Sequence, residues 1–170
     1  MRALKLLLPC LAALALAGCA GYRLGAVGDV PAGARTIQVQ PFNNQTLQPR
    51  LGDNMTQAVR ERIQTDATYR LVTGETGDLI MNGVIRDYHR VQLGYLNQDA
   101  STPQNFRVSV TVHVVVRDRA SDKIVLERDI IGHTLVNVGP DFASSERQAG
   151  ALLAEDTAQT IVSQLTEGAW

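Results

Sequence analysis

The chain has 170 residues, of which 45% are hydrophobic, 19% charged and 5% aromatic. These values are ordinary for a globular protein and exclude collagen-like, low-complexity and fully disordered chains. The formal net charge is -1, and two of the 16 Lys and Arg residues, Arg2 and Lys5, lie in the leader described next, which leaves 14 basic against 17 acidic residues. This balance argues against nucleic-acid binding through a bulk positive field.

The N-terminus has the pattern of an export signal. Two positive charges lie within the first five residues, and an apolar run follows from Leu6 to Ala17. At about 1.5 Å per residue, twelve helical residues span roughly 18 Å, well short of the ~30 Å hydrocarbon core of a bilayer. We therefore expect residues 1–18 to be a signal peptide rather than a membrane-spanning helix.

The apolar run ends in Leu16-Ala17-Gly18-Cys19, which resembles a bacterial lipobox. This resemblance implies cleavage before Cys19 and acylation of that cysteine, and two or more acyl chains give stable anchoring where one does not. Ala20 rather than Asp after the cysteine implies sorting to the outer membrane, with the chain held on its periplasmic side. Cys10 leaves with the signal, so we expect no disulfide, no cysteine metal site and no cysteine nucleophile in the mature chain.

The mature chain is expected to consist of a lipidated tether, 19–34, and one domain, 35–170. Pro49 suits the first turn of a helix over 49–66, in which Leu51, Met55, Val59 and Ile63 form an apolar stripe. A second helix is predicted to start between 141 and 145 and to end near Gly168. Its expected buried stripe consists of Ala151, Ala154, Ala158, Ile161, Val162 and Leu165.

Alternating and short apolar runs predict strands over 35–42, 69–73, 79–92, 105–118 and 124–135. Residues 43–48 are expected to form a polar turn, and 93–104 a polar loop. The order of strand, helix, strands and helix predicts an α+β domain of two layers. Its mixed sheet is expected to have four to five strands, with both helices on one face.

Strand register argues against a metal site formed by the three histidines. A symmetric loop places His89 opposite Val108, and a tight hairpin at 120–123 places His133 opposite Ser109 and His113 opposite Asp129. His113 then lies roughly 14–17 Å along the sheet from the other two, and His89 and His133 point to opposite faces. The sequence also has no nucleophile elbow and no phosphate loop. We therefore expect no metal, no catalytic residue and no cofactor other than the lipid on Cys19.

The same registers predict a polar sheet face that the helices do not cover. On it, Tyr88, Ser109, Thr111 and His113 are candidates for contact with another protein. Arg86, Arg90 and Arg107 are candidates for contact with an anion, since the register sets Arg90 directly opposite Arg107. Like charges in this position are unfavourable unless an anion or carboxylate compensates, although the pair can also be splayed into solvent.

Several segments together resemble the LptE family, the lipoprotein component of the lipopolysaccharide translocon. They are the start at Cys19 to Leu24, the strand and turn at 36–46 before the first helix, the strand at 77–85 (GDLIMNGVI), and the alternating strand at 106–116 with the turn after it. Their order and spacing cover nearly the whole mature chain.

The resemblance implies a non-enzymatic role. Members of the family plug the LptD β-barrel, assist its assembly and help to deliver lipopolysaccharide to the outer leaflet. It implies an LptD-like barrel and lipopolysaccharide as partners, with lipid A phosphates meeting Arg86, Arg90 and Arg107. An alternative is a periplasmic lipoprotein that regulates a cell-wall synthase or a secretion channel, because such lipoproteins share a similar strand–helix opening.

Overall fold

A computed structural model describes residues 34–96, 99–137 and 142–167. The expected signal peptide, Cys19 and most of the tether lie outside the described residues. The elements, in chain order, are β1 (Thr36–Val39), β2 (Asn43–Asn44), α2 (Leu51–Asp66), β3 (Arg70–Val72), β4 (Leu79–Leu96), β5 (Asp99–Asp118), β6 (Ile124–Asn137) and α3 (Phe142–Glu167).

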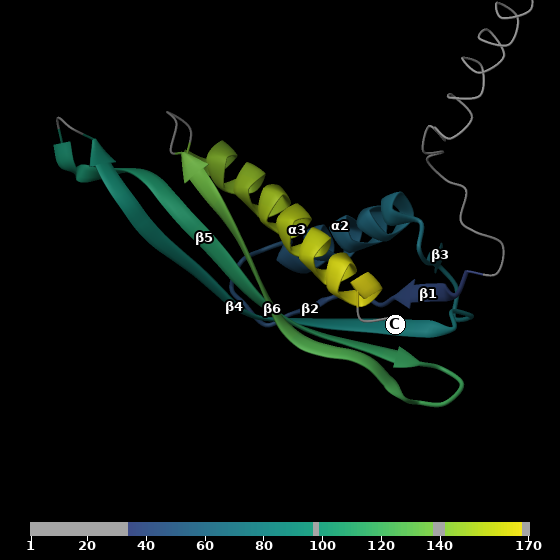
Figure 1. The fold of residues 1–170 in the computed structure, drawn as a ribbon. Helices are drawn as coiled ribbons and strands as arrows, with labels where there is room; N and C mark the ends of the chain where they lie inside the picture. The colour runs from purple at the N-terminus through teal and green to yellow at the C-terminus, as the bar shows by residue number, and fades with distance from the viewer. Residues whose placement is uncertain (1–33, 97–98, 138–141, 168–170) are drawn as a thin grey trace, which may run out of the picture.

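The described strands form a mixed sheet in the order β3-β1-β4-β5-β6, and β2 pairs separately with β4. β1 is parallel to both β3 and β4, whereas β4, β5 and β6 are antiparallel to one another. Both helices lie on the same side of the sheet, and the β4–β5 hairpin reaches past the N-terminal end of α3 (Figure 1). The α+β fold with two layers is thus confirmed.

The core lies between the helices and one face of the sheet. The predicted stripe on α2 is buried, and so are the alternate valines of β5, Val108 to Val116. On α3 the predicted stripe is buried except at Ala151, which is exposed, and Leu153 is buried in its stead. Burial of apolar surface at about 25 cal/mol per Å² is the main force that holds the two layers together.

Two glycines allow close approach of the layers. An added Cβ at Gly83 would lie 2.1 Å from the ring of Phe42, and one at Gly132 would lie 1.8 Å from the hydroxyl of Thr157. Phe42 therefore packs directly on β4, and α3 packs directly on β6. Thr157 is fully buried, and its hydroxyl donates to the carbonyl of Leu153 at 2.6 Å.

Three local predictions were wrong. Residues 93–96 and 99–104 continue β4 and β5 rather than forming a loop, and Asn43–Asn44 forms a short strand rather than only a turn. A bulge lies in β4 between Ile85 and Asp87. The predicted register of the first hairpin holds as far as Ile85, opposite Val112, and is shifted by one residue beyond it.

The bulge has a direct consequence for side-chain direction. Adding one residue to a strand turns every later side chain to the opposite face. The tight β5–β6 hairpin has no such interruption between residues 105 and 116, and there the predicted register is confirmed.

Candidate functional site

The uncovered face of the sheet, defined here as the face away from α2 and α3, is organised in rows. Residues directly opposite one another in neighbouring strands point to the same face. Rows of residues cross β4, β5 and β6 on this face at spacings of about 6.8 Å along the strands, and four consecutive rows concern the candidate site. They are Val84–His113–Asp129, Asp87–Thr111–Ile131, His89–Ser109–His133 and Val91–Arg107–Leu135.

The first row carries a compact group of charges. His113 Nδ1 lies 2.7 Å from Asp129 Oδ1, as the register predicts, and His113 Nε2 lies 3.7 Å from Glu127. Arg86, at the bulge, donates from Nη1 to both carboxylate oxygens of Asp129, at 2.9 and 3.2 Å. The side chains of Arg86 and Asp129 are about half exposed, so their ion pair contributes at most about 1 kcal/mol. The Asp129 carboxylate is thus paired with Arg86 and lies within hydrogen-bonding distance of His113, both within the chain.

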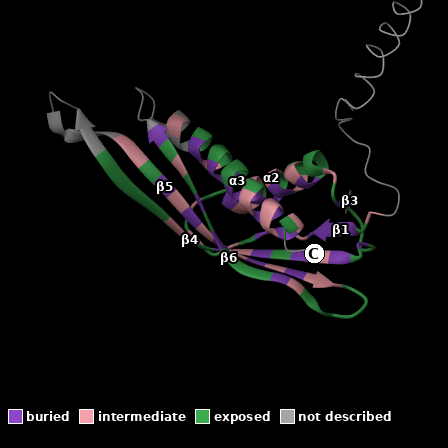
Figure 2. Cartoon of the chain, viewed as in Figure 1, coloured by how far each residue is buried: buried purple, intermediate pink, exposed green. Residues whose placement is uncertain are grey.

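The opposite end of the uncovered face is different. Arg107 lies between Val91 and Leu135, which are 56% and 60% exposed, and Ile131 two rows away is 67% exposed. Within the described residues, Arg107 has no ion pair or side-chain hydrogen bond. Figure 2 shows how exposed residues continue along this half of β4. A cation flanked by exposed apolar side chains suits contact with another molecule.

Two of the predicted contact residues lie on the other face. Tyr88 is opposite Val110 and packs against the core, and Arg90 is opposite Val108 rather than Arg107. The Arg90 guanidinium lies over the ring of Phe106, 5.2 Å from its centre. The bulge at Arg86 is the physical reason. Ser109, Thr111 and His113 are on the uncovered face, as predicted.

The predicted arrangement of the histidines also needs correction. His89 is opposite Ser109, so His89 and His133 share one row and one face instead of pointing to opposite faces. His113 lies four residues along β5 from that row, about 14 Å away. No group of three or more His, Cys, Asp or Glu side chains suited to a metal ion is found in the described part of the chain.

A signal for the bulge was present in the sequence. The apolar alternation of 79, 81 and 85 breaks at the consecutive charged pair Arg86-Asp87, and the next aromatic residue is Tyr88, three residues after Ile85. An interval of three within a period-2 strand is what a bulge with one extra residue produces.

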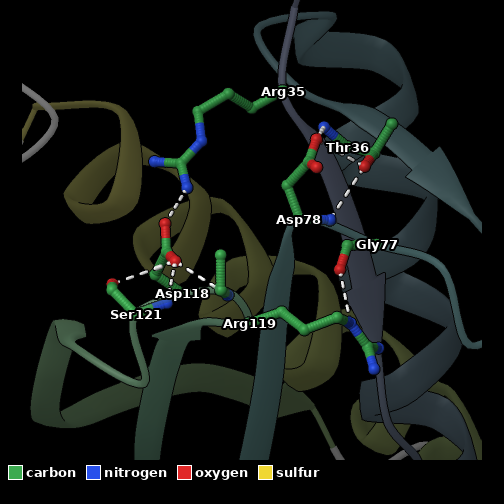
Figure 3. Close-up of polar contacts among 8 residues, drawn as sticks. Arg35, Thr36, Gly77, Asp78, Asp118, Arg119 and Ser121 are labelled. Carbon is green, nitrogen blue, oxygen red and sulfur yellow. Dashed lines mark hydrogen bonds and ion pairs between the residues drawn. The ribbon is translucent and has the colours of Figure 1, made fainter.

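A second polar cluster lies where β1 begins, near the N-terminal end of the described residues (Figure 3). The Asp78 carboxylate accepts from the backbone N–H and the hydroxyl of Thr36, at 2.8 and 2.7 Å. These hydrogen bonds hold the pKa of Asp78 below its usual value. The cluster therefore joins β1 to the first residue before β4.

The β5–β6 turn closes the same cluster. Hydrogen bonds from the backbone N–H and hydroxyl of Ser121 lower the pKa of Asp118, and the Arg35 guanidinium pairs with the same carboxylate. Arg119 donates from Nε to the carbonyl of Gly77 at 2.8 Å and from Nη2 to the side chain of Gln38 at 2.6 Å. Each of these carboxylates and guanidinium groups is thus engaged within the chain, which indicates a structural role in holding the start of β1 to β4 and to the β5–β6 turn.

The helices carry one further hollow, a groove of about 470 Å³ between α2 and α3. It is lined by Asn54, Gln57, Ala58, Glu61, Arg62, Thr65, Ala151, Glu155 and Gln159. This lining contains no histidine, cysteine or serine. Neither helix in the described part of the chain has the length and apolar character needed to cross a bilayer.

Taken together, these features define a small two-layer α+β domain with one sheet face that its helices leave uncovered. Residues 34–165 match the sequence profile of the LptE family, which is described as lipopolysaccharide-assembly. The chain therefore belongs to the LptE family of lipopolysaccharide-assembly proteins, whose members associate with LptD and are not enzymes. No curated protein matches the sequence.

Solved structures share the fold at low sequence identity. A Xanthomonas campestris protein of the DUF330 family is 9% identical, with a TM-score of 0.61, over 84% of this chain and 91% of that one. A minor lipoprotein from Acinetobacter baumannii is 13% identical, with a TM-score of 0.52, over 79% and 94%. PelC from Paraburkholderia phytofirmans, crystallised as a dodecamer, is 12% identical, with a TM-score of 0.52, over 81% and 93%. At these identities the likeness concerns the fold alone.

Proposed function

We propose that this chain is an outer-membrane lipoprotein, acylated at Cys19 and held on the periplasmic side, that plugs an LptD-like β-barrel and assists its assembly. In this role it helps to deliver lipopolysaccharide to the outer leaflet and makes or breaks no bond. Membership of the LptE family and the lipobox-like sequence before Cys19 support the proposal. The domain proper spans 35–170, and 19–34 is its tether.

The observation that carries the proposal is the uncovered face of the sheet. The lumen of a large barrel is polar, so a plug should present a polar surface whose charges are already balanced. The row formed by His113 and Asp129, with Arg86 beside it, meets this condition because its charges pair within the chain. Such a surface loses less when water is removed from it than a surface with unpaired charges would. The exposed Ile131 and Leu135 add apolar area that the contact would bury.

Of the three arginines predicted to contact lipopolysaccharide, Arg107 is the best placed to do so. Arg86 is held by Asp129, and Arg90 lies over Phe106 on the other face. Arg107 alone of the three is on the uncovered face with no ion pair among the described residues. A guanidinium binds phosphate with two parallel hydrogen bonds, and flanking apolar side chains suit an amphiphile. Arg107 is therefore the proposed phosphate contact.

Co-purification tests both parts of this proposal. The acylated protein, isolated from membranes in mild detergent, is expected to bring a large β-barrel protein and lipopolysaccharide with it. Arg107→Glu should reduce the lipopolysaccharide in the complex, while Arg70→Glu, on β3 at the far end of the sheet, should not. Isolation of the chain without any barrel protein would refute the plug role. Equal lipopolysaccharide content in the two variants would refute the role of Arg107.

A further inference from the structure

The sheet has three edges where a further strand could add, and two of them are obstructed. β3 is only three residues long. β6 lies under α3, with Thr157 packed on Gly132, and the Asp156 carboxylate accepts a hydrogen bond from the backbone N–H of His133 at 3.1 Å. Covering an edge with a helix and occupying its N–H groups are devices that prevent unwanted strand pairing.

The third edge is the half of β4 that follows the bulge. β1 pairs with Leu79–Met81 and β2 with Val84–Ile85. From Asp87 to Leu93, no strand among the described residues pairs with β4 on that side. Strand β2 therefore pairs with only the first part of this side of β4, and no described strand continues that pairing beyond Ile85.

The backbone direction along this edge follows from the pairing. The N–H of Gln45 donates to the carbonyl of Ile85 at 3.0 Å, so the backbone of Ile85 points toward β2. The bulge at Arg86 adds one residue, so that beyond it the even-numbered residues present their backbone groups to the same side. Gln92 is one of these residues, and it is exposed.

An exposed apolar residue follows β2 by three positions. Leu47 is fully exposed, yet the loop that carries it is braced. Asn44 Oδ1 accepts from the N–H and the hydroxyl of Thr46, and Asn44 Nδ2 donates to the carbonyl of Gln48. Farther along, Val91 and Leu93 are 56% and 48% exposed. Fixing a large apolar side chain in water is unfavourable unless a partner covers it.

We propose that the β4 edge from Asp87 to Leu93 binds an extended segment of the barrel partner as an added β-strand, with Leu47 packed against its end. This inference rests on the proposed function, since it names how the partner is held. The added strand would continue the position of β2, gaining main-chain hydrogen bonds along β4 and apolar contacts at its ends. The site is thus a strand-addition site rather than a pocket.

The structure favours a segment of another protein over a second copy of this chain. In an antiparallel pair of copies centred on the middle of this edge, Arg90 would face its own counterpart, and like charges directly opposite are destabilising. The strands of a closed barrel wall have no free edges, because every backbone group pairs with a neighbour. The added strand is therefore a loop or soluble segment of the partner outside its barrel wall.

Hydrogen exchange on the co-purified complex of the full acylated chain and its barrel tests this inference. The even-numbered amides within Asp87–Leu93, which face the proposed strand, should exchange at least about tenfold more slowly in the complex than in the free chain, while amides of β6 near Asp156 change little. Gln92→Pro removes one outward N–H without removing a β4–β5 hydrogen bond, and should weaken the complex about threefold to tenfold. Gln92→Ala keeps the N–H and should bind normally, and circular dichroism should show both variants folded.

Leu47→Ser gives a second test that does not depend on the strand, because the side chain has no contacts to lose within the domain. It should weaken the complex and leave the thermal unfolding midpoint unchanged. If a complex forms with undiminished exchange along β4, or if Gln92→Pro and Leu47→Ser bind as tightly as the parent chain, the strand-addition site is refuted and the plug role stands. If protection appears only through dimers of this chain, the choice of partner is refuted. If no barrel protein co-purifies, the proposed function and this inference both fail.

Discussion

Phe42 holds β4 against the helices through a contact that only glycine allows. Its ring atoms would lie 2.1, 2.3 and 2.6 Å from a Cβ at Gly83, and its backbone is fixed by a 2.9 Å hydrogen bond from its N–H to the Thr56 hydroxyl. Because the ring has little room to retreat, Gly83→Ala should destabilise the fold by about 1–3 kcal/mol, the usual cost of overpacking. The sign of this change in the free energy of unfolding is informative, because glycine in a strand is otherwise less stabilising than alanine by roughly 0.5–1 kcal/mol.

A double-mutant cycle identifies the ring as the cause. Phe42→Ala should cost about 3–5 kcal/mol, since the ring is 5% exposed. In the double variant the new methyl group enters vacated space, so the total should fall short of the sum of the single changes by at least about 1 kcal/mol. Urea denaturation followed by circular dichroism measures all four proteins. A neutral Gly83→Ala, or strict additivity, would refute this packing.

Three further predictions concern charge, the β6 edge and the uncovered face. The pKa values of Asp78 and Asp118 are lowered in the folded state, so their stabilising contribution is complete above the unfolded pKa near 4 and is lost as pH falls through the folded values. The urea midpoint of unfolding should therefore drop as the pH is lowered from 6 to 2, and it should drop less steeply in Asp78→Asn. Asp156→Ala should remove the acceptor of the His133 N–H on β6 and so accelerate hydrogen exchange at that amide. An unchanged exchange rate would show that this hydrogen bond does not form in solution. Ile131→Lys and Leu135→Lys, both at exposed positions, should change stability by less than about 0.5 kcal/mol yet reduce recovery of the barrel partner, and full recovery would exclude these side chains from the interface.

The elements that could be predicted are those whose pattern is set locally. The four-residue spacing of Leu51, Met55, Val59 and Ile63 defines the buried side of α2, and the alternate valines of β5 define the inner side of the sheet. The register of β5 with β6 was predictable because a short turn joins them and leaves little freedom. His113 therefore faces Asp129 as predicted.

The candidate site was predictable only as far as the bulge. A symmetric loop at 93–104 implies the observed register of Leu79 to Ile85, but one extra residue at Arg86 reverses every side chain beyond it. Tyr88 and Arg90 were consequently assigned to the wrong face. An alternating pattern predicts side-chain directions only for a regular strand and does not account for a bulge. The three-residue interval from Ile85 to Tyr88 was nevertheless a sign of one.

The central claim is that the uncovered face of the sheet contacts the inner wall of a β-barrel. Photocrosslinking in cells from a probe at Thr111, which lies in the middle of that face between Asp87 and Ile131, tests it most directly. The account predicts an adduct with a large outer-membrane barrel protein, mapped to residues that line its lumen. An abundant, membrane-bound protein that gives no barrel adduct from Thr111 would contradict it.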